Sequence, residues 1–183
     1  MPWIPNTQIA SSGGALSLIE EIILSIAGTT IDFQNIPATY RVLVIYVYAR
    51  GDTAATFVNL DLRFNADAGT NYHREFLAGT GSSSTASQAV SDTEMQIGEI
   101  SAANAPASYF AAGSVHIPYY ANTVGFKAIY AETFDSRGTA ATTQIRMMAG
   151  GLWLSTDAIN RVQLIVAAGN FVADSRATLY GIT

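Results

Sequence analysis

Residues 42–48, Val-Leu-Val-Ile-Tyr-Val-Tyr, would form a β-strand that is apolar on both faces. Side chains of a strand alternate between its two sides. One face would carry Val42, Val44, Tyr46 and Tyr48, and the other Leu43, Ile45 and Val47. A strand in a two-layer antiparallel protein commonly needs only one apolar face. The segment therefore predicts a second layer over one face. The other face would be covered by loops of the partner sheet or, as we favour, by a neighbouring subunit.

Alternation of apolar and polar residues continues along the chain and predicts an all-β fold. Val58, Leu60, Leu62 and Phe64 alternate with four polar residues, and 162–166 repeats the pattern. Segment 15–28 fits either a helix or a strand, and we favour a strand because it runs into the extended 29–33. The patterns predict nine to ten strands, with loops at 79–92, 101–108 and 133–142. We expect a single-domain antiparallel β-sandwich of jelly-roll type over 15–183, after a flexible N-terminal arm at 1–14.

The composition favours burial of surface in an assembly. Of the 183 residues, 49% are hydrophobic and 13% are charged, whereas soluble domains average about 25% charged residues. Lys127 is the only lysine among nine basic residues, and interfaces favour arginine and tyrosine over lysine. The sequence therefore predicts a homo-oligomer, most plausibly a homotrimer. A net charge of -5 argues against a nucleic-acid partner, and no apolar run is long enough for a membrane helix.

Residues that could support catalysis or bind a metal are few, so we expect no enzyme, cofactor or metal. Cysteine is absent, and His73 and His116 are the only histidines. The carboxylates of Asp61 and Glu75 lie on successive predicted strands, where outward charges are ordinary. The 65–71 segment could offer oxygen ligands to calcium, but Asx-type turn bonds explain the same residues. The Arg-Gly-Asp tripeptide at 50–52 falls where a turn is expected, and three letters are weak evidence for cell adhesion.

Three motifs together resemble a pattern in small all-β virion proteins of tailed bacteriophages. They are Asp-Phe-x-x-Ile-Pro-x-x-Tyr at 32–40, Arg-Phe-Asn-x-Asp-x-Gly-x-Asn-Tyr at 63–72, and Leu-Tyr-Gly-Ile at 179–182. The resemblance implies a jelly-roll capsid decoration (cement) protein, commonly trimeric, that bridges capsomers. Its partners would be further copies of itself and the major capsid protein. It would sit on the capsid surface of the virion after synthesis in the bacterial host cytoplasm.

The same resemblance leaves a second function open, namely a tail-fibre or host-recognition module that binds cell-surface glycans. Exposed aromatic residues lining a groove would favour this alternative. For the decoration protein we predict partner-binding residues in two places. Trp3 and Ile4 would anchor the arm, and Val42, Val44, Tyr46 and Tyr48 would meet a neighbouring subunit.

Overall fold

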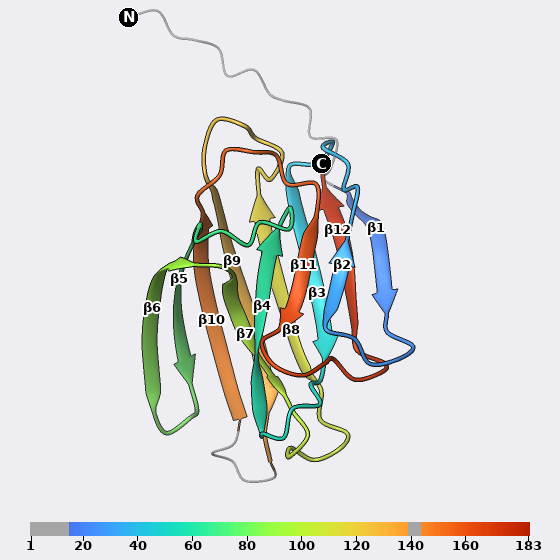
Figure 1. The fold of residues 1–183 in the computed structure, drawn as a ribbon, viewed down its shortest axis with the longest axis vertical. Coiled ribbons are helices and arrows are strands. Elements are labelled where there is room, and N and C mark those ends of the chain that lie inside the picture. Colours follow the sequence, from blue (N-terminus) through green and yellow to red (C-terminus); the bar gives the residue numbers. More distant parts are fainter. Residues whose placement is uncertain (1–14, 139–143) are drawn as a thin grey trace, which may run out of the picture.

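The protein is a β-sandwich of twelve antiparallel strands in two sheets (Figure 1). The computed structural model describes residues 15–138 and 144–183, and these residues contain no helix. The strands are β1 (Leu16–Ile23), β2 (Thr30–Phe33), β3 (Val42–Ala49), β4 (Phe57–Phe64), β5 (Tyr72–Gly79), β6 (Ser84–Asp92), β7 (Met95–Ser101), β8 (Ala111–Pro118), β9 (Lys127–Ser136), β10 (Gln144–Trp153), β11 (Val162–Val166) and β12 (Arg176–Ile182).

The larger sheet has eight strands in the order β1-β12-β3-β8-β9-β10-β5-β6, and the smaller has four in the order β2-β11-β4-β7. Figure 1 shows the smaller sheet in front of part of the larger one, with β6 and β1 at opposite edges of the larger sheet. The single-domain β-sandwich predicted from the sequence is confirmed.

Two hairpins, β5–β6 and β9–β10, form one end of the larger sheet. Without β5–β6 and β9–β10, each sheet keeps four strands, β1-β12-β3-β8 and β2-β11-β4-β7. The chain then passes from one sheet to the other at nearly every step. Such alternation between two four-stranded sheets is typical of jelly-roll proteins. Both hairpins extend the larger sheet at the same side, beyond β8.

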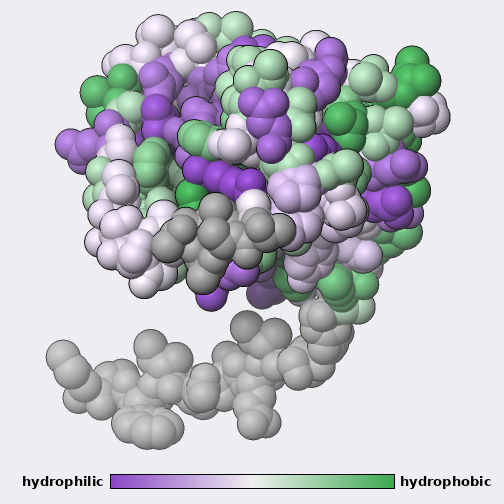
Figure 2. Space-filling model, turned by 90° about the horizontal axis from the view of Figure 1, so that it is seen from below, coloured by the Kyte–Doolittle hydropathy of each residue, from purple (hydrophilic) through white to green (hydrophobic). Residues whose placement is uncertain are grey.

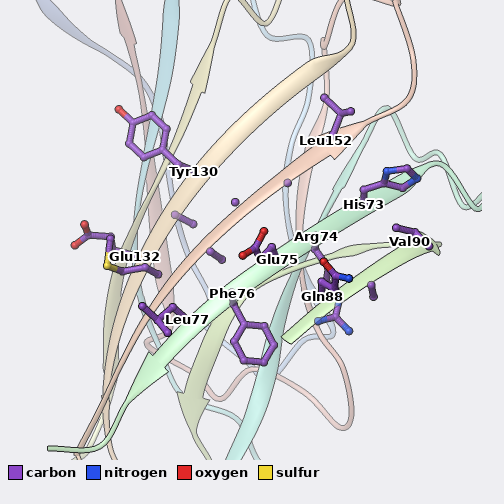
Figure 3. Close-up of a pocket in the computed structure, with 16 residues that line it drawn as sticks. His73, Arg74, Glu75, Phe76, Leu77, Gln88, Val90, Tyr130, Glu132 and Leu152 are labelled. Atoms are coloured by element: carbon purple, nitrogen blue, oxygen red, sulfur yellow. The ribbon is translucent and has the colours of Figure 1, made fainter. Parts of the chain in front are cut away.

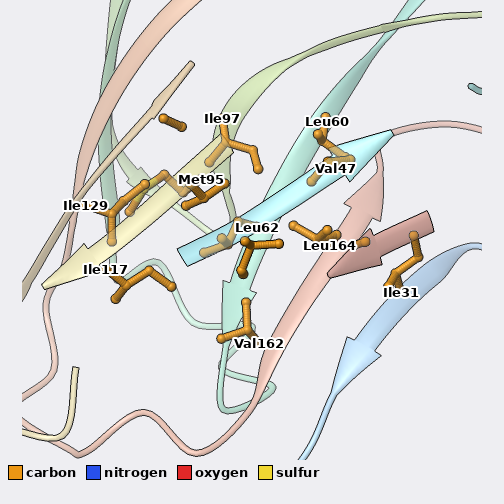
Figure 4. Packing of buried hydrophobic residues seen from close by; sticks show 14 of the residues in the cluster. Ile31, Val47, Leu60, Leu62, Met95, Ile97, Ile117, Ile129, Val162 and Leu164 are labelled. Carbon is orange, nitrogen blue, oxygen red and sulfur yellow. The ribbon is translucent and has the colours of Figure 1, made fainter. Parts of the chain in front are cut away.

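The core lies between the two sheets and is built from alternating apolar side chains (Figure 4). Leu60 and Leu62 of β4 are at most 1% exposed, while Asp61 between them faces outward. Leu43 and Ile45 of β3 face them from the larger sheet, both fully buried. Burial of side chains of this size contributes roughly 1.5–3 kcal/mol each. The alternation of apolar and polar residues along each strand therefore favours packing of the two sheets on each other.

Segment 16–23 is a strand, which decides between the two structures its sequence allowed. β1 pairs antiparallel with β12 and has a register shift between Leu18 and Glu20. As an edge strand it is exposed along much of its length. The backbone pairing with β12 explains why a sequence with helical spacing is extended here.

The prediction of a loop at 79–92 is wrong, because residues 84–92 form strand β6. This edge strand pairs with β5, and nearly all its side chains are exposed. Small polar residues therefore suffice, since backbone hydrogen bonds and not burial hold the strand. The predicted loop at 133–142 is also wrong in its first part, because β9 extends to Ser136. Strand β6, with the short β2, raises the strand number among the described residues above the predicted nine to ten.

Candidate functional site

The outer face of the larger sheet, turned away from the smaller sheet, carries the predicted partner-binding residues of β3. Tyr46 and Tyr48 are 49% and 44% exposed, and Val42 is half-buried. Val44 is only 2% exposed, because Tyr180 of β12 and His116 of β8 lie directly beside it. The opposite side chains of β3, Leu43, Ile45 and Val47, are buried in the core. The smaller sheet thus covers one apolar face of this strand, and the other is partly covered by its own neighbours.

Aromatic contacts order the tyrosines on this face. The Tyr46 ring meets the Tyr180 ring edge-on at 5.9 Å between centroids. The Tyr48 ring stacks on Phe110 at 4.9 Å. Such pairs fix ring positions and contribute about 0.5–1.5 kcal/mol each beyond their buried area.

The exposed apolar area continues to the sheet edge. We call it the β1–β3 face, and it consists of Leu16, Leu18, Ile23, Tyr46, Tyr48 and Tyr180. Leu18 on β1 is 60% exposed and lies directly opposite Tyr180. Glu21, Thr178 and Arg176 lie among these residues on the same face, so the surface combines apolar and polar side chains, as interaction surfaces commonly do. Trp3 and Ile4, the other predicted contact residues, lie outside the described residues.

A groove of about 550 Å³ lies further along the outer face, on strands β5, β6, β9 and β10 (Figure 3). Apolar side chains make most of its lining, including Leu77, Met148 and Leu152. Tyr130 of β9 is 54% exposed at its side, and its ring stacks on His116 at 4.6 Å with an interplanar angle of 8°. The volume is in the range of small-molecule sites.

Carboxylates are the charged acceptors in this groove. Glu132 accepts a hydrogen bond from Nη2 of Arg146 at 2.7 Å, and both side chains are well exposed. Glu75 is exposed on β5, and no cation within the described ranges 15–138 and 144–183 pairs with it. His73 and Gln88 add neutral polar groups to the lining.

The groove was not predicted from the sequence, although the sequence contains a signal for it. Gly150 and Gly151 stand together in the interior of β10. Glycine inside a strand often marks a place where another group approaches closely. A Cβ at Gly150 would meet only the Ile129 carbonyl oxygen, at 3.8 Å, whereas one at Gly151 would clash with Met95 and the His73 carbonyl. Gly150 therefore leaves open space on the outer face, and Gly151 allows close packing inside.

A second, polar pocket of about 220 Å³ lies beside Asp61. Arg63 pairs with Glu94 at 2.9 Å, and Arg74 pairs with Asp92 at 2.9 Å. Burial, reinforced by the Glu94 carboxylate, raises the pKa of Asp61 to about 7. A shifted pKa in a pocket is one sign of a functional site, but no histidine or cysteine among the described residues lines this pocket, and Arg63 and Arg74 are engaged by Glu94 and Asp92.

The carboxylates of Asp61 and Glu75 do not form a pair across a cleft. Asp61 is on β4 in the smaller sheet, and Glu75 is on β5 in the larger sheet. The histidines are also apart, with His73 on β5 and His116 on β8, separated by β9 and β10. In the described part of the chain, no three histidine or acidic side chains gather as a group that could hold a metal ion.

Segment 65–71 is held by side-chain hydrogen bonds, as the Asx-turn interpretation predicts. The Asp67 carboxylate accepts hydrogen bonds from the Gly69 amide at 2.8 Å, from Asn71 at 2.9 Å and from the Trp153 indole at 2.7 Å. Burial raises the pKa of Asp67, but these hydrogen bonds outweigh it and hold the value below the ordinary one. Three N–H donors thus occupy the oxygens that a cation would need.

The Arg-Gly-Asp tripeptide is part of the fold. Arg50 is 6% exposed and donates hydrogen bonds to the carbonyls of Pro106, Tyr109 and Ala105 at 2.7, 2.9 and 2.8 Å. Asp52 accepts from the backbone and side chain of Asn170. The buried guanidinium therefore organises the segment that follows β7 and is not displayed for a receptor.

Comparison with known proteins adds no family. No protein-family model matches the chain, and no curated protein matches it either. Among the described residues, no helix has the length and apolarity to cross a membrane.

Proposed function

We propose that the protein is a structural subunit of a bacteriophage virion and acts as a capsid decoration (cement) protein. It would bind further copies of itself, as a homotrimer, and the major capsid protein at the capsid surface. The observation that carries the proposal is the β1–β3 face, where Leu16, Leu18 and Tyr46 are each about half exposed or more on one sheet surface. We assign this face to contact with a second copy of the chain.

The distribution of basic residues supports contact between protein surfaces. Lys127 is buried, at 2% exposure, and its ammonium donates to the Gly125 carbonyl at 3.0 Å. Arginine therefore supplies the basic side chains of the surface, and it loses less hydration than lysine when a partner covers it. A sandwich without a catalytic constellation among its described residues fits a function that depends on binding alone.

The proposal predicts that charge on the β1–β3 face prevents self-association. Replacing Tyr46 and Tyr48 together by Glu would force two carboxylates into the interface, at a cost of several kcal/mol. We expect a wild-type trimer at micromolar concentration and a folded monomer for the double variant, measured by sedimentation velocity and circular dichroism.

Val124→Glu is the matched control, because Val124 is 86% exposed in the turn after β8 and lies outside this face. It should remain trimeric. A wild-type monomer at about 100 μM would contradict the proposal, since interfaces of ordinary size bind more tightly than this.

One end of the molecule, shown in Figure 2, is a further surface where a partner could bind. The end of the molecule seen there mixes hydrophilic and hydrophobic residues, without one broad apolar area at its centre. The sheet face is therefore a better candidate for self-association than this end.

One observation favours the alternative function, a tail-fibre or host-recognition module that binds glycans. Tyr130 is an exposed aromatic residue that lines a groove, and this is the feature that would distinguish such a module. The groove and the β1–β3 face lie on different strands, so variants can test each surface without altering the other.

A further inference from the structure

The groove on the outer face of the larger sheet is formed by the two hairpins at one end of that sheet. Its lining comes from β5, β6, β9 and β10 alone. The other eight strands contribute none of it. On their opposite face, β5, β9 and β10 bury core residues such as Tyr72, Ile129 and Met147, so the groove lies on the outer side of strands that also form the core.

One row of directly opposed residues crosses the groove. Tyr130 of β9 pairs with Gly150 of β10, Gly150 pairs with Glu75 of β5, and Glu75 pairs with Gln88 of β6. Directly opposed residues share one face of a sheet, and neighbouring strands are about 4.8 Å apart. Tyr130 and Glu75 therefore stand on either side of a strand position that has no side chain.

The Tyr130 ring is fixed in place and available to a ligand. His116, which pairs with Tyr130 across β8 and β9, covers one face of the ring at 4.6 Å. With 54% of the residue exposed, the rest of the ring remains open to solvent. A ring held by a neighbour loses little freedom on binding, which favours its use as a stacking surface.

The polar groups of the groove define what the ligand must offer. The Glu75 and Glu132 carboxylates only accept hydrogen bonds, so the ligand must supply donors. They also repel anions. The Glu132 carboxylate is already paired with the Arg146 guanidinium at 2.7 Å, which leaves Glu75 as the one carboxylate of the groove that a cationic group could pair with among the described residues. Hydroxyl groups can donate to both carboxylates and to the Gln88 amide oxygen without requiring a second charge.

We propose that this groove binds a neutral oligosaccharide. One pyranose ring would lie above Gly150, with its apolar C–H face toward Tyr130 and its hydroxyls donating to Glu75 and Gln88. At about 550 Å³ the groove has room for more than one sugar ring. Leu77, Met148 and Leu152 would contact the apolar faces of the adjoining rings. The inference rests on the alternative function, glycan binding, for which it names the ligand class, and it does not depend on the proposed cement function.

The test is calorimetric titration with hexasaccharides of defined composition. Neutral chitohexaose, cellohexaose and maltohexaose are compared with cationic chitosan hexamer and anionic hexagalacturonate. We expect at least one neutral probe to bind with Kd of about 1 mM or tighter, and we expect no binding of the anionic probe. Tyr130→Ala should weaken binding about tenfold, while Tyr130→Phe keeps the stacking surface and most of the affinity.

Gly150→Val is the sharpest variant, because its side chain would project into the groove from a position where an added Cβ meets only the Ile129 carbonyl oxygen, at 3.8 Å. It should raise Kd about tenfold or more. Gly79→Val is the matched control. Gly79 lies on β5, which pairs with β10, and a Cβ added there meets nothing within 4 Å. Unlike Gly150, it does not line the groove. It should leave Kd within about twofold.

Three results would overturn the inference. They are binding of none of the neutral probes at about 10 mM, preference for the cationic probe, and neutral binding that Gly150→Val leaves intact. Sedimentation of the same variants reports self-association separately. A failure here is therefore distinguishable from failure of the proposed structural function.

Discussion

At the scale of single residues, Asp61 shows how strand position sets the chemistry of a side chain. It faces outward from β4, yet Arg63, Arg74, Asp92 and Glu94 surround it and shield it from water. Burial disfavours its charged form, and the nearby Glu94 carboxylate adds repulsion. Together these raise its pKa from 3.8 to about 7.

The raised pKa predicts that Asp61→Asn stabilises the protein at high pH. Between pH 3.8 and about 7 the native state holds a proton that the unfolded chain has released, so the Asp61 contribution to stability falls as pH rises. Asn does not ionise, so the variant does not lose this stability as the pH rises. We expect a gain in unfolding free energy of the order of 2 kcal/mol at pH 8 and little change at pH 4, measured by urea denaturation.

Asp174→Asn serves as the control for this pH dependence. Asp174 is exposed, and Asn tolerates its positive φ of 67°. Its effect should be similar at the two pH values. Equal effects of Asp61→Asn at pH 4 and pH 8 would show that the carboxyl does not titrate in this range.

At the scale of secondary-structure elements, Gly98 allows β7 of the smaller sheet to approach β9 of the larger one, and Gly113 makes room for Thr133 beside it within the larger sheet. A Cβ added to Gly98 of β7 would lie under 3.0 Å from the Cβ, Cγ2 and Oγ1 atoms of Thr133. Gly113 of β8 faces the same threonine, and its added Cβ would also meet the Glu132 carbonyl. Thr133 is buried at this contact, so the spacing of the two layers depends on missing side chains.

Gly98→Ala should therefore destabilise the protein by about 1–3 kcal/mol through overpacking. Thermal unfolding followed by circular dichroism measures the effect. Adding Thr133→Ala removes two of the three close atoms and should restore part of the loss, which a double-mutant cycle would quantify. Gly79→Ala, where the space is open, should change stability by less than about 0.5 kcal/mol. If the changes in stability of the two single variants simply add in the double variant, the added Cβ at position 98 and the Thr133 side chain do not clash.

At the scale of the whole molecule, function as cement would require several surfaces on one particle. β1 is the edge of the larger sheet and the start of the β1–β3 face. Residues 1–14 precede this strand and carry the predicted capsid anchors Trp3 and Ile4. In a trimer, three such anchors would bind at high effective concentration, so modest single contacts would give strong decoration.

Deleting residues 2–12 is therefore expected to leave a folded trimer that no longer decorates capsids. Co-sedimentation with undecorated particles measures binding, and circular dichroism and sedimentation velocity check the fold and the oligomer. Particles without the protein should release DNA at a lower temperature than decorated ones. Equal stability of both particles, with the protein found at the tail tip, would refute the cement function and favour host recognition.

The amino-acid sequence allowed prediction of the sandwich because burial of a strand leaves a local record. Leu60 and Leu62 alternate with polar residues, and both are in the core. The Asn-Asp-Gly-Asn turn was also predictable, since its side chains bond within a few residues of themselves. Strand β6 was not predictable, because an edge strand held by backbone hydrogen bonds needs no apolar pattern.

What the sequence determined by itself was thus the class of fold, the apolar character of both faces of β3 and the scarcity of catalytic groups. Only the tertiary structure decided which residues meet. The groove joins Tyr130, Gly150 and Glu75 from three strands, and their alignment depends on sheet order and register. Pairing between distant strands leaves no periodic mark in either one, since register arises from the packing of the whole sheet.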